Sequence, residues 1–475
     1  MVSSRRLGAL PWSGRREFLK VAAAAAAGVA CLPGRLDAQS TEGLWAEAGA
    51  ILRRISPPTF PARGFDITRY GAIRDRDADA TAAFRAAIGA CHDAGGGRVI
   101  VPAGRFVTGP IVLRSNVNLH LEKDAVVAFS QDPRAYLPVV LTRYEGVELM
   151  NYSPFIYPFE QENIAITGDG TLDGQAGNAH WWPWRTEAIK PGASRDRLFD
   201  MGKRGVPVAE RVFGDGRWMR PVFVQPYRCR RVLIEGVTIL NSPMWELNPV
   251  LCTNVTVRNV TVRSHGPNND GCDPESCADV LIEGCTFDTG DDCIALKSGR
   301  NNDGRRLHAP IENVIIRNCQ MRDGHGGVVI GSEISGGARY IFAEHCHMDS
   351  PRLDRVLRFK SNAERGGVIE HVAMRDVTVG EVAEAIVAAD FYYEEGDTGA
   401  FTPVLRDVDI RNVTSRKSKY VFFFKGYERS PVSDVRVADC TFNGVVDGDV
   451  LQSVRNLTLA NVHVNGRLRN ESITK

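Results

Sequence analysis

The chain has 475 residues, of which 43% are hydrophobic and 24% are charged, and its formal net charge is +1. These values are typical of a globular protein, and the near-neutral charge gives no reason to expect binding to nucleic acid or to a membrane surface. Repetitive all-β proteins stay single units at this length, so the length does not require a second globular domain.

Residues 1–38 are predicted to be a cleaved export signal. Arg15 and Arg16 precede an uncharged, alanine-rich run at 21–32, as in a signal peptide. The segment SGRREFLK at 13–20 resembles the twin-arginine export signal, with its paired arginines ahead of a mildly hydrophobic stretch. We therefore expect a periplasmic or secreted bacterial protein whose mature chain begins at Gln39.

Two further features concern the membrane. Cys31 follows Val29 and Ala30, which weakly resembles a lipoprotein cleavage site, so a lipid anchor at Cys31 is the less favoured alternative. No later run of about 18 apolar residues occurs, so no membrane-spanning helix is expected.

A polar lead-in at 39–64 precedes the one domain expected, at 65–475. One short helix is predicted near its start, at 81–92, because three glycines follow at 95–97. Short β-branched runs separated by Gly, Asn and Ser come next, and they indicate stacked short strands.

A repeated apolar pattern then organises most of the chain. An apolar residue is followed by apolar residues two, five and seven positions later, with a turn-forming residue in between. The copies begin at Ile164 (a looser copy), Val232, Val255, Val280, Val314, Ile341, Val372, Val408, Val435 and Leu457. The later copies are 22 to 36 residues apart, a period that suits one coil of a β-solenoid.

The cysteines fit the same pattern. At the fifth position of successive copies, Val237 and Val260 are followed by Cys285, Cys319 and Cys346. Because Val and Cys occupy one structural position, the cysteines are expected to be small core hydrophobes. The sequence therefore does not favour a disulfide framework or a zinc site, despite eleven cysteines.

Three acidic residues and a histidine fall at matching positions of adjacent coils. Asp291 lies eleven residues after Val280, and His325 lies eleven after Val314. Equivalent positions of stacked strands are about 4.8 Å apart, so these side chains should be neighbours. With a four-residue insertion in the preceding coil, Asp270 aligns with Asp291, and Asp292 follows directly.

Clustered carboxyls suit the hydrolysis of a glycosidic bond, which needs one carboxylic acid to protonate the leaving oxygen and one carboxylate to activate water. Crowding raises the pKa of at least one member. Arg358 and Lys360 should point the same way on the next coil, with Phe359 in the core, and such cations suit an acidic sugar. The aspartates could instead cap the turns of the solenoid or bind calcium. Arg358 and Lys360 could instead be part of a solvated basic edge.

Four ordered motifs resemble glycoside hydrolase family 28, the polygalacturonases. They are AsnAsnAspGly at 268–271, GlyAspAspCys at 290–293, GlyHisGly at 324–326 and ArgPheLys at 358–360. The resemblance implies an all-β, right-handed parallel β-helix with a short N-terminal helix, and inverting hydrolysis of α-1,4-linked galacturonic acid in pectin. Asn269 and Phe359 depart from the usual Thr and Ile, and neither change touches a charged group.

The resemblance also implies roles for individual residues. Asp291 would be the general acid, Asp270 and Asp292 would position the water, and His325 would support the acid by a hydrogen bond. The expected substrate-binding residues are Asn268, Arg358 and Lys360. No metal and no other cofactor is expected. The expected partner is an acidic polysaccharide or oligogalacturonide, and the sequence indicates no particular oligomeric state.

An insertion at about 176–225 separates the copies at Ile164 and Val232. It holds Trp181, Trp182, Trp184 and Trp218, which could close one end of a cleft and stack on a sugar, or could merely pack the insertion onto the coils. The insertion resembles those of bacterial exo-acting members, as does SerProMetTrpGlu at 242–246, so exo action is predicted.

Two other functions stay as alternatives. A pectate lyase would use a similar β-helix with calcium held by its aspartates and would give an unsaturated product. A glycan-binding solenoid, such as an adhesin or phage tail fibre, would bind without any turnover.

Overall fold

The computed structural model describes residues 41–475, which form one compact unit. The predicted export signal at 1–38 and the alternative lipid site at Cys31 lie outside the described residues. Within 41–475, no helix combines the length and the apolar character needed to cross a membrane.

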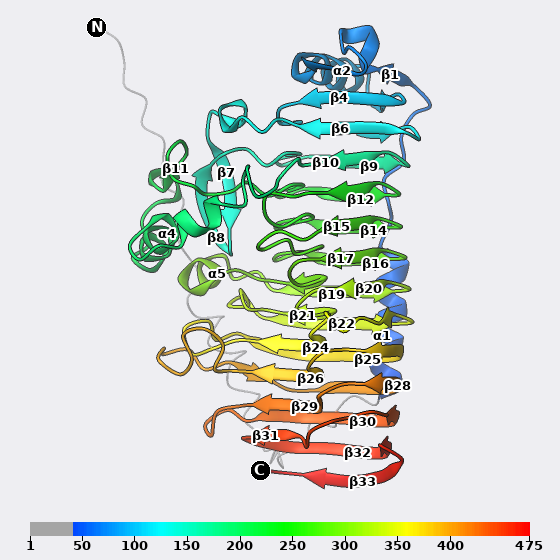
Figure 1. Cartoon of the computed structure of the whole chain (residues 1–475), viewed down its shortest axis with the longest axis vertical. Helices are drawn as coiled ribbons and strands as arrows, with labels where there is room; N and C mark the ends of the chain where they lie inside the picture. Colours follow the sequence, from blue (N-terminus) through cyan, green and yellow to red (C-terminus); the bar gives the residue numbers. More distant parts are fainter. Residues whose placement is uncertain (1–40) are drawn as a thin grey trace, which may run out of the picture. The chain divides into compact units, whose positions relative to one another are not determined.

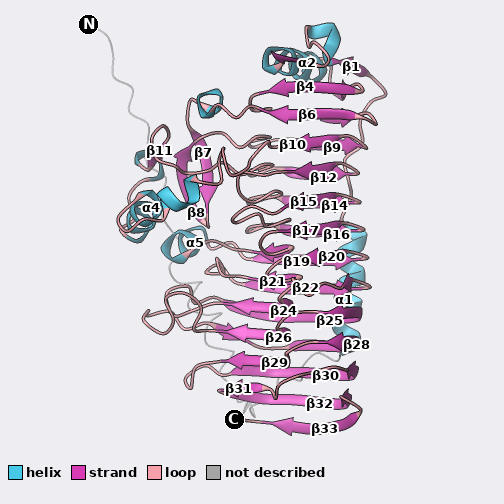
Figure 2. Ribbon diagram, viewed as in Figure 1, coloured by secondary structure: helices cyan, strands magenta, loops and turns pink. Residues whose placement is uncertain are grey.

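The described residues form a right-handed parallel β-helix whose coils stack along one axis (Figure 1; Figure 2). Its long sheet contains β1 (Gly64–Asp66), β2 (Arg76–Asp79), β3 (Gly97–Val101), β4 (Gly104–Thr108), β5 (Val117–Leu121), β6 (Ala125–Phe129), β9 (Glu162–Gly168), β10 (Thr171–Asp173), β12 (Arg230–Glu235), β13 (Thr238–Leu240), β14 (Thr253–Arg258), β15 (Thr261–Ser264), β16 (Ala278–Glu283), β17 (Thr286–Thr289), β19 (Ile311–Arg317), β20 (Gln320–Asp323), β22 (Ala338–Glu344), β23 (His347–Met348), β25 (Val368–Glu381), β27 (Val404–Leu405), β28 (Val408–Lys417), β30 (Val432–Phe442), β32 (Val454–Val464) and β33 (Arg467–Ile473).

A second parallel sheet forms another face of the coils. Its strands are β18 (Ile294–Leu296), β21 (Val328–Ile330), β24 (Arg355–Lys360), β26 (Ala385–Asp390), β29 (Tyr420–Lys425) and β31 (Val450–Gln452). A separate small sheet contains β7 (Val140–Tyr144), β8 (Val147–Asn151) and β11 (Val212–Phe213).

Helices are few. They are α1 (Thr41–Arg54), α2 (Thr81–Asp93), α3 (Trp184–Ala188), α4 (Ser194–Lys203) and α5 (Asn301–Leu307), with 3-10 turns η1 (Ile67–Tyr70), η2 (Pro133–Tyr136) and η3 (Val208–Glu210). The helix predicted at 81–92 is confirmed as α2, which buries Phe84 and Ile88 at the N-terminal end of the coils.

The strand register confirms the predicted repeat. The first positions of the copies pair in order, from Ile164 with Val232 to Val435 with Leu457, and every one of these pairs is parallel. Their side chains are buried in one continuous core. The ten cysteines within the described residues are buried and unpaired, and those at the repeat positions, such as Cys285, Cys319 and Cys346, lie in the core as predicted.

The lead-in at 39–64 is predicted only as a polar segment, with no helix named within it, and the structure adds one. The first part of the lead-in is the 14-residue helix α1, which lies along the outer surface of the long sheet (Figure 1). Leu44, Ala48 and Ile51 are spaced four and three residues apart, so they share one helix face. That face is buried against outward-pointing side chains of the sheet, including Ile315 and Phe342.

The insertion forms a side layer next to the coils. β11 pairs with β8, so the insertion adds a strand to the β7–β8 hairpin, and α4 packs against the same hairpin (Figure 1). The sequence pattern did not predict this hairpin. It forms a wall of charged residues at one side of the row of turns that carries Asp270, Asp291 and His325.

Candidate active site

The predicted acidic row is formed by turns on three successive coils. Asp270 precedes the bridge at Cys272, Asp291 and Asp292 lie between β17 and β18, and His325 lies between β20 and β21. The backbone links these turns directly, because Gly271 donates to the carbonyl of Asp292 over 3.0 Å and His325 donates to that of Asp291 over 3.1 Å. The alignment of coils made from the sequence is therefore confirmed.

A glycine allows this close stacking. Gly324, just before His325, has a φ of 139°, and a Cβ at this position would lie 2.3 Å from the carbonyl oxygen of Asp291. An L side chain would be strained and would push the two turns apart. Gly324 therefore holds His325 at its distance from Asp291.

Three predicted carboxyls converge. Each of Asp270, Asp291 and Asp292 offers an oxygen, and these oxygens lie within 4.8 Å of one another. They open onto a cleft of about 440 Å³, which is also lined by Asn268, His325, Arg358 and Lys360. All seven residues predicted for the site thus share one cleft.

His325 and Asp291 form a pair. Nδ1 of His325 lies 2.9 Å from Oδ1 of Asp291. This hydrogen bond raises the pKa of His325, although partial burial opposes the shift. Burial alone would raise the pKa of Asp291, but the bond and the charge of His325, with Lys360 and Lys297, lower the pKa to about 2. The proton of the pair therefore lies on His325 before substrate enters.

Asp292 is fully buried and is held by the two predicted substrate-binding cations. Nζ of Lys360 donates to Oδ2 of Asp292 over 2.6 Å, and Nη1 of Arg358 lies 3.5 Å from Oδ1. Phe359 between them is buried in the core, as predicted. The ring of Tyr393 covers both cations, at 5.6 Å from Arg358 and 5.3 Å from Lys360. These contacts fix the orientation of the Asp292 carboxyl group.

Asp270 carries the raised pKa that crowding predicts. Burial raises it well above the usual range, and the charges of Asp273 and Asp291 add to the shift. Lys297 lies 3.6 Å from Asp270, 3.7 Å from Asp273 and 3.2 Å from Glu333, so one buried ammonium serves three carboxyls. Asp270 thus takes up a proton more readily than Asp291.

Sequence reasoning missed Lys297, Asp273 and Glu246. Glu246 is fully buried next to Asp270, and burial raises its pKa well above the usual range although Ser264 opposes the shift. Lys297 directly follows the apolar run at 294–296, where it resembles Lys360 at the end of β24. That likeness could have placed Lys297 beside the acids.

The three aspartates are close enough to hold a metal ion, but their partners do not favour one. Lys360 and Arg358 face Asp292, Lys297 faces Asp270, and His325 faces Asp291, all within 3.6 Å. A divalent cation would meet this positive charge at close range. The residues present therefore do not fit the calcium site that a pectate lyase requires.

The tryptophans of the insertion pack against the coils. Trp181 is buried between Tyr136 and Phe155, and Trp184 contacts Trp181 and Trp218. None of Trp181, Trp182, Trp184 and Trp218 lines the cleft, which favours the packing alternative over stacking on a sugar in the cleft. The cleft instead meets charged residues of the insertion, Arg185 and Arg195.

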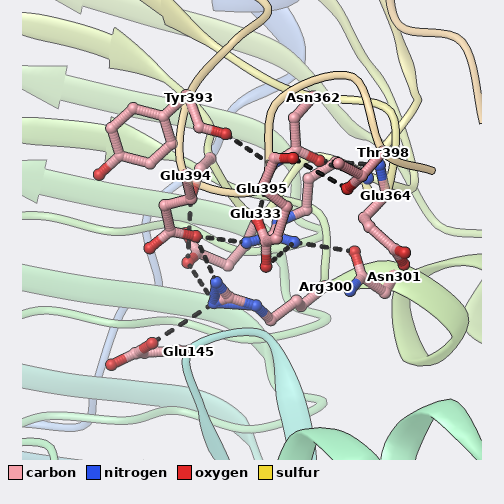
Figure 3. Close-up of polar contacts among 12 residues, drawn as sticks. Glu145, Arg300, Asn301, Glu333, Asn362, Glu364, Tyr393, Glu394, Glu395 and Thr398 are labelled. Atoms are coloured by element: carbon pink, nitrogen blue, oxygen red, sulfur yellow. Dashed lines mark hydrogen bonds and ion pairs between the residues drawn. The ribbon is translucent and has the colours of Figure 1, made fainter. Parts of the chain in front are cut away.

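A network of ion pairs fixes the wall beside the cleft (Figure 3). Arg300 lies 3.4 Å from Glu145 of the β7–β8 turn and donates to Glu394 over 2.6 Å. Arg195 of α4 also binds Glu145, at 2.8 Å, and Arg365 binds Glu394, at 2.6 Å. Five residues far apart in sequence are thus joined into one wall, which bounds the cleft at Glu145, Arg195 and Glu394.

Comparisons with known proteins agree with this geometry. The family model "Glycosyl hydrolases family 28" matches residues 214–464. The crystal structure of a hyperthermoactive exopolygalacturonase from Thermotoga maritima is 42% identical, with a TM-score of 0.87, over 91% of this chain and 98% of that chain. A probable polygalacturonase of Vitis vinifera is 27% identical over 80% of this chain and 74% of its own length. An exo-poly-alpha-D-galacturonosidase of Dickeya chrysanthemi is 26% identical over 74% of this chain and 62% of its own length.

Proposed function

The chain belongs to glycosyl hydrolases family 28, and from this membership we propose that it hydrolyses α-1,4-linked galacturonic acid from the ends of pectin or polygalacturonate chains. The observation that carries the proposal is the convergence of Asp270, Asp291 and Asp292 in one cleft beside Arg358 and Lys360. Carboxyls supply acid and base catalysis, and the cations attract an acidic sugar.

The acid in this proposal is Asp291. His325 passes its proton from Nδ1 to Oδ1 of Asp291 as the acidic substrate enters, and Asp291 gives this proton to the glycosidic oxygen while the bond from that oxygen to the anomeric carbon breaks. The 2.9 Å contact between the two residues provides the path. His325 thus acts through Asp291 and is a positioning and proton-storing residue.

The water is held by Asp270 and Asp292. Its oxygen bonds to the anomeric carbon, and its proton goes to Asp270, the carboxyl whose pKa is raised. Asp292, fixed by Lys360, accepts the other hydrogen bond of the water. In its ionised form Asp270 is a stronger base than an ordinary aspartate, because its pKa is raised, and it accepts the water's proton from that form.

The stereochemical outcome is proposed to be inversion, as the resemblance to polygalacturonases implies. The three carboxyl groups approach within 4.8 Å, closer than the roughly 6.5–9.5 Å that separates the two carboxyls of most inverting enzymes. The distance rule alone would favour retention, so the anomeric form of the product is an informative measurement.

Exo action rests on the wall beside the cleft. The insertion and the β7–β8 hairpin bring Arg195 and Glu145 to its edge, and Arg195 pairs with both Glu145 and Glu394 there. Figure 3 shows Arg300 between the same two glutamates, to which it is also paired. A fixed wall admits the end of a polymer and obstructs its middle. The similarity to an exopolygalacturonase over 91% of this chain supports the same mode.

The experiment for this function is an incubation of residues 39–475 with polygalacturonate in the presence of EDTA, following reducing ends, product size and ultraviolet absorbance. We expect monogalacturonate alone, with no unsaturated product. A mixture of oligomers would contradict exo action, and an unsaturated product that EDTA abolishes would replace the hydrolase with a lyase. Binding without reducing ends would point to a glycan-binding solenoid.

We also propose that the protein is exported to the periplasm or outside, on the strength of the Arg15–Arg16 motif and the apolar run after it. Exported protein should begin at Gln39, as N-terminal sequencing would measure, and replacing both arginines by lysine should keep the precursor in the cytoplasm. A mature chain that begins with a lipidated Cys31 would contradict the predicted cleavage.

A further inference from the structure

Charge pairing in the cleft singles out one residue. Arg195, Lys297, His325, Arg358 and Lys360 each line the cleft and each have a carboxylate within 4.0 Å. Arg185 lines the same cleft, and among residues 41–475 it has no such partner. A cation facing a cleft without a protein anion is free to bind an anionic group of the substrate.

Arg185 stands on a firmly held support. It is exposed at the start of α3, and Ile189, one turn later, also faces the cleft. The segment is anchored by the buried ring of Trp181 and by Trp182, whose Nε1 donates to the carbonyl of Ser242 over 2.9 Å. The tryptophans of the insertion therefore fix the position from which Arg185 reaches into the cleft.

A second cation lies behind the first. Arg220 is 1% exposed and donates to the carbonyls of Pro243 and Pro267 and, over 2.7 Å, to Oδ1 of Asn268. It has no carboxylate within 4.0 Å among the residues that the structure describes. Burial lowers the pKa of Arg220 and repulsion from Arg185 adds to this, while Tyr144 and the charge of Glu145 oppose the shift. Within residues 41–475, neither Arg185 nor Arg220 has a carboxylate within hydrogen-bond distance, so the two cations together favour an anion at this wall.

Asn268 connects Arg220 to the cleft. Its Oδ1 accepts from Arg220, so its amide nitrogen is left to donate, and no acceptor for it occurs within residues 41–475. Arg185 and Asn268 together therefore present donors toward the cleft, with the charge of Arg220 behind them. Hydrogen-bond donors with a positive charge behind them are suited to bind a carboxylate.

Polygalacturonate carries one carboxylate on every sugar. Arg358 and Lys360 are both paired with Asp292, so they can contact only the sugar unit that lies next to Asp292. We propose that Arg185, with Asn268 and the buried Arg220 behind it, binds the carboxylate of a galacturonate unit adjacent to the one that is cleaved. The inference rests on the proposed function and makes Arg185 a specificity-determining residue for non-esterified substrate.

The test compares Arg185→Gln with the wild-type enzyme on trigalacturonate and on its fully methyl-esterified form. A charge-assisted hydrogen bond is worth about 1.5–3 kcal/mol, so KM for the acid should rise about tenfold or more while kcat changes little. KM for the neutral ester should not change. Arg185→Lys should recover part of the loss. The matched control is Lys190→Gln, which removes a charge from the same insertion but from a lysine paired with Glu187 outside the cleft.

A binding measurement separates this inference from the proposed function. The affinity of trigalacturonate is measured by calorimetry for Asp291→Asn, with and without Arg185→Gln. A loss of affinity with Arg185→Gln supports the carboxylate site whether or not the wild-type enzyme turns over substrate. An unchanged affinity, or an equal rise in KM for acid and ester, overturns it. If the wild-type enzyme is active but Arg185→Gln leaves the affinity for trigalacturonate unchanged, the proposed function stands and only the role of Arg185 is contradicted.

Discussion

Nδ1 of His325 lies 2.9 Å from Oδ1 of Asp291, across two adjacent coils and 34 positions of sequence. This contact joins the one imidazole of the cleft to the carboxyl proposed as the general acid. Because the pair holds a single proton, the pH at which the pair loses this proton should limit both activity and part of the stability.

Replacement of the acid should remove most of the rate. Asp291→Asn cannot donate a proton, and general acid catalysis contributes about 10²–10⁴-fold. We therefore expect kcat on polygalacturonate to fall by at least a hundredfold, measured by reducing ends. Asp288→Asn is the matched control, because Asp288 binds His265 over 2.9 Å outside the cleft. Equal losses in both variants would contradict the assignment.

The pair should also give a window in the pH dependence of stability. The raised pKa of His325 stabilises the fold fully below its ordinary value of about 6.5, and this contribution is lost as the pH rises through the raised pKa. The pKa of Asp291 is lowered to about 2, so Asp291 stabilises the fold fully above the ordinary aspartate pKa of about 3.9. This stabilisation is lost as the pH falls through about 2.

His325→Gln should therefore lower Tm most between about pH 4 and 6.5, and its kcat/KM should lose the alkaline limb that the wild type is expected to show above about 6.5. Thermal unfolding and initial rates across pH 3 to 9 would measure both. A Tm difference that is constant across this range would contradict the charged pair.

Glu246 should be uncharged in the folded protein. Because its pKa is raised by burial, the unfolded chain releases a proton that the folded chain keeps, so stability falls as the pH rises above the ordinary value of about 4.3. Glu246→Gln removes this penalty and should gain stability relative to wild type with rising pH, by at most about 1.4 kcal/mol per pH unit. Denaturant unfolding at several pH values measures the difference, and a loss that grows with pH would show an ionised Glu246.

Cysteines of the repeat should tolerate apolar replacement. Cys285 occupies the position that Val260 holds one coil earlier, and both are fully buried. Cys285→Val should change the free energy of unfolding by less than about 1.5 kcal/mol, since the swap conserves apolar character and approximate volume. Cys285→Ser should cost about 1–3 kcal/mol, because it buries a hydroxyl. Equal costs would indicate a role for the thiol itself.

The sequence predicted the coils and the acidic row because both depend on local register. Once Val280 and Val314 are aligned, Asp291 and His325 follow by counting, and the structure places them in contact. Arg358 and Lys360 were likewise found from strand alternation, and both reach the cleft.

The wall of the cleft could not be predicted in this way. The contacts of Arg300 with Glu145 and Glu394 join residues separated by 155 and 94 positions, and no repeat relates them. Helix α1 was missed for another reason. Three apolar residues in a polar segment are a weak pattern by themselves, and the sequence does not show that the outer face of the sheet presents apolar side chains, such as Phe342, for a helix to pack against. Glu246 was passed over because a buried acid resembles a surface one in sequence.

Proton nuclear magnetic resonance during the first minutes of polygalacturonate hydrolysis tests the central claim most directly, because one spectrum reports the bond that is cleaved, the size of the product and its anomeric form. The account predicts free galacturonic acid that appears first as the β anomer and then mutarotates. Initial α anomer would contradict the inverting roles of Asp270 and Asp292, and the vinyl signal of an unsaturated product would contradict hydrolysis altogether.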